Sequence, residues 1–247
     1  MKAVEWKNVT KQFSDAQAPA LRRISVAVEE GEFVCILGRS GCGKTTLIKL
    51  VNRLLEPDEG EICLFGVPVR DRDPVELRRG IGYVIQQVGL FPHMKVYDNV
   101  ATLPRILKWD RQRTAARVDE MLSLVDLDPS EYRDRYPSRL SGGQQQRVGL
   151  ARALIADPKV CLFDEPFGAI DAITRENLQN ELLKIHRSLK RTYLFVTHDI
   201  REALKLGTKV MILHEGQVVQ YDSPEEIVRH PAHSFVRDML AAAEIST

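Results

Sequence analysis

The chain has 247 residues, enough to bury a sizeable core in one large domain or two small ones. Its 35 Lys and Arg side chains against 34 Asp and Glu give a net charge of +1, which argues against a nucleic-acid partner. No apolar run approaches the roughly 18 residues of a membrane-spanning helix, and the polar start Met-Lys-Ala-Val-Glu-Trp-Lys is not a secretion signal.

The first third of the chain is predicted to be rich in β-strand around one glycine-rich loop. Strands are expected over residues 2–9, over 24–37 with a turn at Glu30-Gly31, over 60–66 and over 81–85. The loop itself is Gly38-Arg39-Ser40-Gly41-Cys42-Gly43-Lys44-Thr45-Thr46. An apolar strand precedes it, and Leu47, Ile48, Val51, Leu54 and Leu55 follow it with the spacing of one helix face. This order matches G-x-x-x-x-G-K-[ST], the phosphate-binding loop of P-loop nucleotidases.

The chemistry of this loop follows from its setting between a strand and a helix. Glycines let the backbone wrap closely around a polyphosphate, and the helix N-terminus adds unpaired N–H donors. Lys44 is placed to reach the β- and γ-phosphates, and the Thr45 hydroxyl to ligate Mg²⁺. The alternative interpretation is a glycine-rich turn that matches by chance.

The four cysteines, Cys35, Cys42, Cys63 and Cys161, form no C-x-x-C pair, so we expect a reduced, cytosolic protein without structural zinc. Cys42 lies inside the glycine-rich loop, next to a helix N-terminus and Lys44. Both features lower the pKa of a thiol, so we predict that Cys42 is unusually reactive.

The rest of the chain alternates strands with helices. From residue 89 to about 157 we predict a helical block, with one helix over 110–126 and another that begins at Ser141. Buried strands are expected over 160–164, 193–197 and 210–213, and an amphipathic helix over 174–190. A capped helix should begin at Ser223, and a short one should lie around 235–240. This alternation predicts an α/β fold with a largely parallel sheet.

Two further motifs carry chemistry. Asp164-Glu165-Pro166 follows an apolar strand, at the end of the sheet where α/β proteins bind ligands. Asp164 is placed to hold Mg²⁺, and Glu165 to polarise a water that attacks the γ-phosphate; the alternative is an ordinary strand-end turn. In Leu140-Ser141-Gly142-Gly143-Gln144-Gln145-Gln146-Arg147, Ser141 and Gln144 form a capping box. The two glycines would let an anion approach the helix end, unless this motif is only a capped helix start.

The run from Leu140 to Arg147 resembles the signature motif of the ABC-transporter ATPases, and the resemblance extends over almost the whole chain. Residues 82–86 resemble the family's Q-loop, with Gln86 as the glutamine that senses metal and water. Gly168-Ala169-Ile170-Asp171 resembles the D-loop, with isoleucine where leucine is usual, and Thr197-His198-Asp199 resembles the switch histidine segment. Phe13 sits where the family stacks an aromatic side chain, often tyrosine, on adenine.

The resemblance implies an α/β P-loop nucleotidase core with a mostly parallel sheet, an N-terminal antiparallel β subdomain and an inserted α-helical subdomain. The whole chain would be one ABC-type ATP-binding domain. Its core would comprise residues 1–88 and 158–235, its helical subdomain residues 89–157 and its C-terminal tail residues 236–247.

The resemblance also implies a mechanism, in which two copies form a head-to-tail homodimer that closes on ATP and reopens after hydrolysis. Glu165 and His198 would be catalytic, and Thr45, Gln86 and Asp164 would hold Mg²⁺. The implied nucleotide-binding residues are Phe13, Gly38, Arg39, Ser40, Gly41, Cys42, Gly43, Lys44, Thr45, Thr46 and Gln86, with Ser141, Gly143 and Asp171. The implied partners are transmembrane permease subunits and an extracytoplasmic solute-binding protein, with this subunit peripheral at the cytoplasmic face of the membrane.

Within the family, residues 85–94 and 164–175 resemble the ATPases of quaternary-amine osmoprotectant importers, which carry glycine betaine, carnitine or choline. Polar amino-acid importers are the nearest alternative. An ABC-type ATPase that acts on DNA would place a coiled-coil or zinc-bearing insertion between Lys44 and Asp164, where only a compact helical block is predicted. A nucleotide kinase would not need the Ser141 motif.

The last residues carry one further expectation. ATPases of osmoprotectant importers often continue into a regulatory pair of CBS modules, whereas residues 231–247 are too few for a second core of about 40 residues. We therefore expect no built-in sensor of ionic strength or of a signalling nucleotide.

Overall fold

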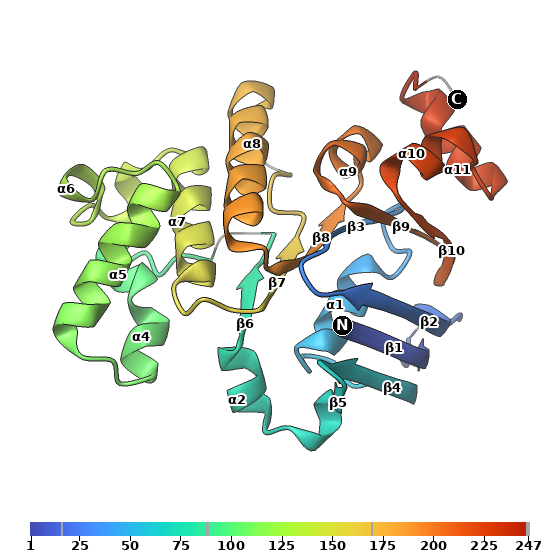
Figure 1. Cartoon of the computed structure of the whole chain (residues 1–247), viewed down its shortest axis with the longest axis horizontal. Helices are drawn as coiled ribbons and strands as arrows, with labels where there is room; N and C mark the ends of the chain where they lie inside the picture. The colour runs from blue at the N-terminus through green and yellow to red at the C-terminus, as the bar shows by residue number, and fades with distance from the viewer. Residues whose placement is uncertain (16, 87–88, 169, 246–247) are drawn as a thin grey trace. The chain divides into compact units, whose positions relative to one another are not determined.

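The structure is a computed structural model of the chain. It describes residues 1–15, 17–86, 89–168 and 170–245. The chain divides into two compact units, of which the first comprises Met1–Arg78 with Lys190–Thr247 and the second Arg79–Leu189 (Figure 1).

The first unit begins with an antiparallel sheet in the strand order β2-β1-β4-β5. The strands are β1 Lys2–Lys11, β2 Leu21–Glu29, β4 Glu59–Leu64 and β5 Val67–Pro68. Along β1, Val4 and Trp6 are buried with the period of two that a strand imposes. The register with β2 shifts between Trp6 and Val9, which brings Val9 into the core as well. The prediction of an N-terminal antiparallel β subdomain is confirmed.

The same unit contains parallel strands. Strand β3 (Phe33–Leu37) pairs in parallel with β8 (Thr192–Thr197) and with β9 (Lys209–His214). All five residues of β3 are buried, as its unbroken apolar sequence predicted for a strand covered on both faces. Strand β10 (Gln217–Asp222), which was not predicted, pairs antiparallel with β9.

Helices cover these strands of the first unit. Helix α1 (Lys44–Val51) packs against β8 and β4, and α9 (Ile200–Leu206) against β3 and β8. The remaining helical segments are a 3-10 turn at Val69–Asp71, α2 Pro74–Arg79, α10 Pro224–Arg229 and α11 Ser234–Ala242. The predicted helices from Ser223 and around residue 235 are therefore confirmed as α10 and α11.

The second unit joins one parallel strand pair to a set of helices. Strand β6 (Ile81–Val84) pairs in parallel with β7 (Val160–Asp164). The helical segments are α3 Val96–Val100, α4 Thr102–Ile106, α5 Arg111–Leu124, α6 Pro129–Tyr132, a 3-10 turn at Pro137–Arg139, α7 Gly142–Leu154 and α8 Ala172–Leu189.

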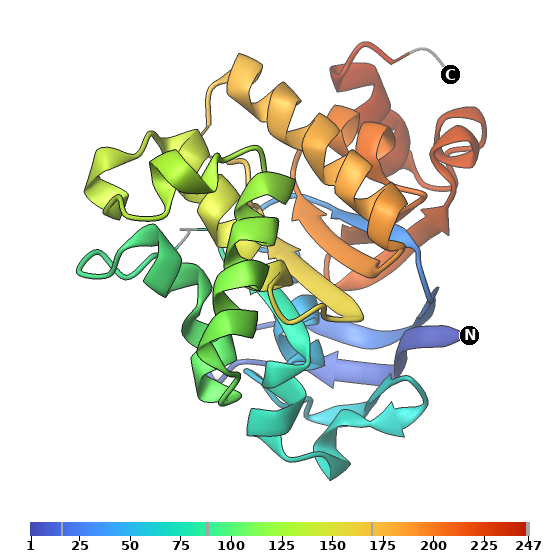
Figure 2. The ribbon, with the colours of Figure 1, turned by 60° about the vertical axis from the view of Figure 1, so that its left-hand side comes forward.

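Helices α5 and α8 both pack against α7, as Figures 1 and 2 show from two sides. Helix α8 buries Leu178, Leu182 and Ile185, the face that their spacing predicted. The α/β fold class with mostly parallel pairing is confirmed by these strands, whereas the predicted subdomain boundaries at residues 89 and 157 stay a prediction. Within the described part of the chain, no helix combines the length and the apolar character needed to span a membrane.

Candidate functional site

The glycine-rich loop joins the carboxyl end of β3 to the N-terminus of α1. Gly43 is the N-cap of α1 and has a φ of 106°, in the left-handed region that favours glycine. A Cβ at Gly43 would lie 2.4 Å from the carbonyl oxygen of Ala20, so a side chain has no room there. No side chain caps this helix N-terminus. Its first turn therefore suits a phosphate group, whose oxygens accept from backbone N–H groups.

Lys44 lies inside this loop and is only 5% exposed. Its ammonium group donates to the carbonyl oxygens of Gly38, at 2.8 Å, and of Arg39, at 3.1 Å. A buried ammonium group requires such acceptors, and phosphate oxygens are stronger acceptors than neutral carbonyls because they are charged. The loop therefore fits a polyphosphate, whose oxygens could replace the two carbonyl acceptors of Lys44.

Cys42 does not have the lowered pKa that its neighbours predicted. The thiol is only 8% exposed. Burial raises its pKa, while the Lys44 charge and backbone hydrogen bonds lower it by a smaller amount. The expectation of a lowered thiol pKa is wrong, because desolvation outweighs the charge of Lys44. All four cysteines are free and buried.

His198 follows the carboxyl end of β8, on a turn held by hydrogen bonds. The Thr197 hydroxyl donates to Glu202 and accepts from the backbone N–H of Asp199. The Asp199 carboxylate in turn caps α9 by accepting from the N–H of Arg201 at 2.8 Å. These bonds fix the backbone on both sides of His198, whose own side chain is exposed.

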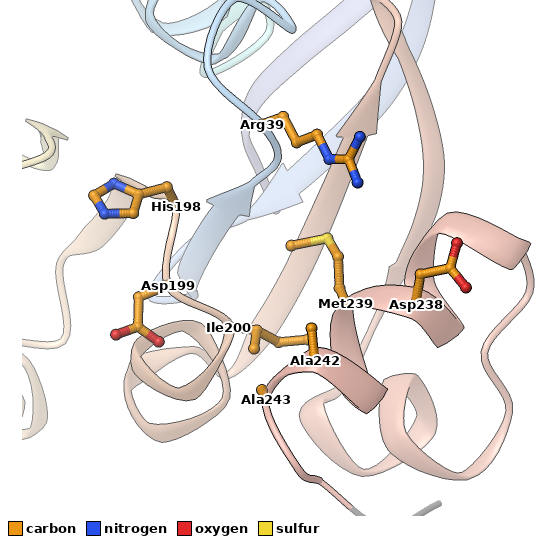
Figure 3. Close-up of a pocket in the computed structure, with 8 residues that line it drawn as sticks. All are labelled: Arg39, His198, Asp199, Ile200, Asp238, Met239, Ala242 and Ala243. Atoms are coloured by element: carbon orange, nitrogen blue, oxygen red, sulfur yellow. The ribbon is translucent and has the colours of Figure 1, made fainter.

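Arg39 of the loop and His198 line the same cavity, which has a volume of about 400 Å³. Figure 3 shows residues of α11, among them Met239 and Ala242, on the opposite wall. The Arg39 guanidinium lies 5.4 Å from the centre of the Phe235 ring on the same helix. Within the first unit, the structure therefore brings the loop and the predicted switch histidine to one cavity.

The acidic motif lies at the end of β7 in the second unit. Asp164 is the last residue of the strand and is only 7% exposed. Glu165 follows with a φ of 46°, a left-handed conformation that costs about 1–2 kcal/mol for a residue with a side chain. Such strain is concentrated at functional sites. The Gln86 amide nitrogen lies 3.5 Å from a Glu165 carboxylate oxygen, so the structure brings these two predicted residues together.

Asp164 suits a Mg²⁺ ion that is bound mainly by the phosphates of a nucleotide. Among the residues that the structure describes, no three His, Cys, Asp or Glu side chains cluster as a metal site. Mg²⁺ usually takes one or two carboxylates together with substrate phosphates and water. One buried carboxylate near the end of a strand suits that arrangement.

Sequence reasoning missed Tyr83 on β6. Burial together with the nearby Asp164 carboxylate raises the pKa of Tyr83 to about 12. The signal that could have found it is the alternation of side chains along two parallel strands, which places a tyrosine beside a strand-end aspartate.

The predicted signature motif forms the N-terminus of α7. Ser141 Oγ accepts from the Gln144 N–H at 3.3 Å, and Gln144 Oε1 accepts from the Ser141 N–H at 2.9 Å, so the predicted capping box is confirmed. A Cβ at Gly142 would meet nothing within 4 Å, whereas one at Gly143 would lie 2.6 Å from Thr174 Cγ2. Close packing against Thr174 of α8 explains why position 143 is a glycine. The contact of Gly143 with a nucleotide stays a prediction.

Two other predicted site residues lie outside these groups. The Thr174 N–H donates to the Asp171 carboxylate at 3.0 Å and lowers the pKa of that carboxyl, so Asp171 caps the start of α8. Phe13 is 40% exposed, with the Lys11 ammonium 5.9 Å from its ring centre, and presents a flat apolar surface. Ala169 of the predicted D-loop, and Gln87 and Val88 of the importer-like stretch, lie outside the described residues.

Comparisons with known proteins agree with the predicted family. The family model described as ABC transporter matches residues 21–168. The chain is 52% identical over 221 residues to the glycine betaine/carnitine/choline transport ATP-binding protein OpuCA of Bacillus subtilis (strain 168), which covers 90% of this chain and 58% of that protein. It is 47% identical over 242 residues to the glycine betaine uptake system ATP-binding protein YehX of Escherichia coli (strain K12), with coverage of 98% and 78%.

Solved structures resemble the chain as well. A dimeric ATP-binding cassette in a post-hydrolysis state, bound to ADP and Pi, matches with a TM-score of 0.79 and 36% identity, over 90% of this chain and 98% of that one. The cbiO1 protein of Clostridium perfringens, part of an ABC transporter complex, matches with a TM-score of 0.85 and 27% identity, over 97% and 95%. The chain spans 61%, 58% and 59% of the length of three of the curated relatives it matches. By sequence and by fold, the chain belongs to the ABC transporter family.

Proposed function

We propose that the chain is the ATP-hydrolysing subunit of a membrane ABC importer. The observation that carries the proposal is the group at the end of β7, where the strained Glu165 lies 3.5 Å from Gln86 and next to the buried Asp164. Together with a phosphate loop in the same chain, this group supplies a base, its positioning amide and a metal-binding carboxylate. These are the parts that hydrolysis of a nucleoside triphosphate requires.

The phosphate loop binds the nucleotide in this proposal. Residues Gly38 to Thr46 surround the phosphates, Lys44 moves from its loop carbonyls to the β- and γ-phosphates, and Phe13 stacks on the adenine. Mg²⁺, when bound, neutralises charge on the phosphates, and Thr45, Gln86 and Asp164 are the residues that would hold it.

Glu165 acts as the general base that takes a proton from the attacking water. Gln86 holds the Glu165 carboxylate through the contact described above. His198 contacts the γ-phosphate, and the hydrogen bonds of Thr197 and Asp199 keep its turn in place. The products of the reaction are ADP and phosphate.

A second copy of the chain completes each ATP site. Ser141, Gly143 and Asp171 of the partner copy would contact the bound ATP, so that ATP closes a head-to-tail dimer and hydrolysis reopens it. The dimeric state of the cassette bound to ADP and Pi supports this arrangement.

The transported solute is proposed to be a quaternary-amine osmoprotectant, and the names of the relatives support this choice. Relatives named for choline, carnitine or glycine betaine transport are 47–52% identical. Relatives named for import of spermidine and putrescine or of sulfate are 41% and 42% identical. Permease subunits and an extracytoplasmic solute-binding protein would complete the importer, with this subunit peripheral at the cytoplasmic face of the membrane.

The first experiment tests the hydrolytic role with Glu165→Gln. The variant should bind ATP as the wild type does. It should hydrolyse ATP at least about a hundredfold more slowly, because a general base contributes at least that factor. Gel filtration with ATP should show a stable dimer. Glu225→Gln, which changes an exposed carboxylate on α10, serves as control and should hydrolyse ATP normally. Near-normal turnover by Glu165→Gln would remove this residue from the mechanism.

The second experiment tests the solute. Cells that depend on this chain should take up radiolabelled glycine betaine, and cells that carry Glu165→Gln instead should lose that uptake. Uptake of a polar amino acid should be the same in both strains. If the Glu165→Gln cells lose only amino-acid uptake, the solute is a polar amino acid and the proposed quaternary amine is wrong.

A further inference from the structure

A tyrosine on a different helix holds the capping box of α7 from outside. Gln144 uses both ends of its side-chain amide, since Oε1 accepts from the Ser141 N–H at 2.9 Å and Nε2 donates to the Tyr132 hydroxyl at 3.1 Å. Tyr132 is the last residue of α6. The two bonds together fix which way the amide faces, because a reversed amide would bring its NH₂ group against the Ser141 N–H, donor against donor.

The Tyr132 side chain is itself held in place. It is half-buried, and the Arg135 guanidinium lies 4.6 Å from the centre of its ring. Arg135 forms an ion pair with Glu131 at 2.6 Å. The backbone N–H of Tyr132 donates to the carbonyl oxygen of Asp128, whose side chain caps α6. The phenol therefore offers Gln144 an acceptor at a defined place.

The same capping box determines how the Ser141 hydroxyl can be used. Ser141 Oγ accepts from the Gln144 N–H at 3.3 Å, so its own hydrogen points away from that bond. Ser141 is exposed, and among the residues that the structure describes its hydroxyl hydrogen has no acceptor. Beside it, a Cβ added at Gly142 would meet nothing within 4 Å. The hydroxyl can therefore donate to an oxygen of a ligand that approaches the start of α7.

We propose that Tyr132 is a positioning residue, which holds Gln144 so that the Ser141 hydroxyl donates to a phosphate oxygen of the ATP bound by a second copy. The inference rests on the proposed function, because it assumes that two copies share each ATP. Tyr132 contacts no nucleotide in this proposal and acts only through Gln144. Without the phenol hydroxyl, the Gln144 amide can rotate and bind water, which leaves Ser141 less well oriented. The consequence is a weaker ATP-bound dimer of a chain that folds and binds ATP normally.

The chain offers a matched control at Tyr136, on the segment that follows α6. Tyr136 is 44% exposed, and its hydroxyl has no hydrogen bond within the described part of the chain. Tyr136→Phe therefore removes the same chemical group close by in the sequence without breaking a bond to Gln144. A Gln144→Ala background supplies the second control, because it removes the group through which Tyr132 is proposed to act.

The test measures ATP-driven dimerisation by analytical ultracentrifugation, in proteins that all carry Glu165→Gln so that ATP is not consumed. Tyr132→Phe should raise the dissociation constant of the dimer about 3–10-fold, because each dimer contains two such sites and one hydrogen bond contributes a modest factor. Binding of a fluorescent ATP analogue to the monomer should be unchanged, and the unfolding midpoint should fall by no more than about 3 °C. Tyr136→Phe should dimerise like the parent protein. In the Gln144→Ala background, Tyr132→Phe should have no further effect on dimerisation.

The outcomes separate this inference from the proposed function. If Ser141→Ala weakens the dimer while Tyr132→Phe matches the parent protein, the positioning role is overturned and the function stands. An equal effect of Tyr132→Phe with and without Gln144 would also overturn it, as would weaker nucleotide binding by the monomer together with a much lower unfolding midpoint. If Lys44→Ala and Ser141→Ala both dimerise on ATP like the parent protein, the two-copy site of the proposed function itself fails.

Discussion

The two glycine-rich helix N-termini of this chain, at α1 and at α7, are built in opposite ways. Helix α1 begins after Gly43, which has no side chain, and no side chain caps it. Helix α7 begins after Ser141, whose side chain and that of Gln144 close a reciprocal capping box. Both carry the partial positive charge of a helix N-terminus.

From this difference we expect the N-terminus of α1 to be the main phosphate site and the N-terminus of α7 a secondary one. At α1, the N-cap is a glycine without a side chain, and the ammonium of Lys44 is buried in the loop, which suits a phosphate group. At α7, Ser141 Oγ already accepts from the Gln144 N–H, so one of the free N–H groups of the first turn has a partner without a ligand. We therefore expect α1 to dominate ATP affinity, and α7 to contribute only when a second copy presents it.

The largest expected effect is that of Lys44→Ala. Loss of charge-assisted bonds to two phosphates, at about 1.5–3 kcal/mol each, should weaken ATP binding about a hundredfold or more. Isothermal titration calorimetry measures the affinity, and circular dichroism confirms the fold. Lys49→Ala, on the last turn of the same helix, should bind ATP normally. An unchanged affinity in a folded Lys44→Ala protein would contradict the primary role of this loop.

A smaller effect is expected at the start of α7, where Gly142 and Gly143 have different reasons to be glycine. Gly143→Ala should destabilise the protein by about 1–3 kcal/mol through overpacking against Thr174. Gly142→Ala has open space, so it should be neutral or stabilise the helix by up to about 1 kcal/mol. Urea unfolding of both variants measures the difference.

Thr174→Ser sharpens this comparison, because it removes the Cγ2 atom that a Gly143 Cβ would meet and keeps the hydroxyl. It should restore the stability of Gly143→Ala. If it does not, the destabilisation arises elsewhere, and packing against α8 is not the reason for glycine at this position.

Next in size is Ser141→Ala, compared with Ser223→Ala at the N-cap of α10. Each should lower the free energy of unfolding by about 1 kcal/mol, because each removes an N-cap. Only Ser141→Ala should weaken ATP-driven dimerisation of the Glu165→Gln protein, measured by analytical ultracentrifugation. Equal dimerisation of the two variants would indicate that Ser141 is a cap and nothing more.

The smallest expected effect concerns Cys42 at the start of α1. Because burial raises the pKa of its thiol, maleimide should label it more slowly than the unfolded chain at neutral pH. The labelling rate should continue to rise above the ordinary thiol pKa of about 8.5, since the thiolate forms only at higher pH. Mass spectrometry of labelled peptides follows this rate. Rapid labelling of the folded protein at pH 7 would mean that the Lys44 charge lowers the pKa of the Cys42 thiol by more than burial raises it.

Local chemistry made several parts of this site predictable. The Ser141 capping box, the buried strand before the phosphate loop and the helix after it each depend on residues a few positions apart. The amphipathic face of α8 likewise followed from its spacing. Strand β10 and the short helices α2 and α9 were not predicted, because brief segments carry too few residues to establish a period.

The sequence by itself determined which residue types stand at the phosphate loop, after β7 and at the start of α7, and hence the family and the chemistry. Only the tertiary structure decided that Lys44 is buried, that burial raises the pKa of the Cys42 thiol and that Tyr83 lies near Asp164. The same is true of the contact between Gln86 and Glu165. The physical reason is that desolvation and strand register depend on which distant segments pack together. Secondary-structure propensity and helix capping act within a few residues, so they can be predicted from the sequence. Desolvation and strand register cannot be predicted in this way.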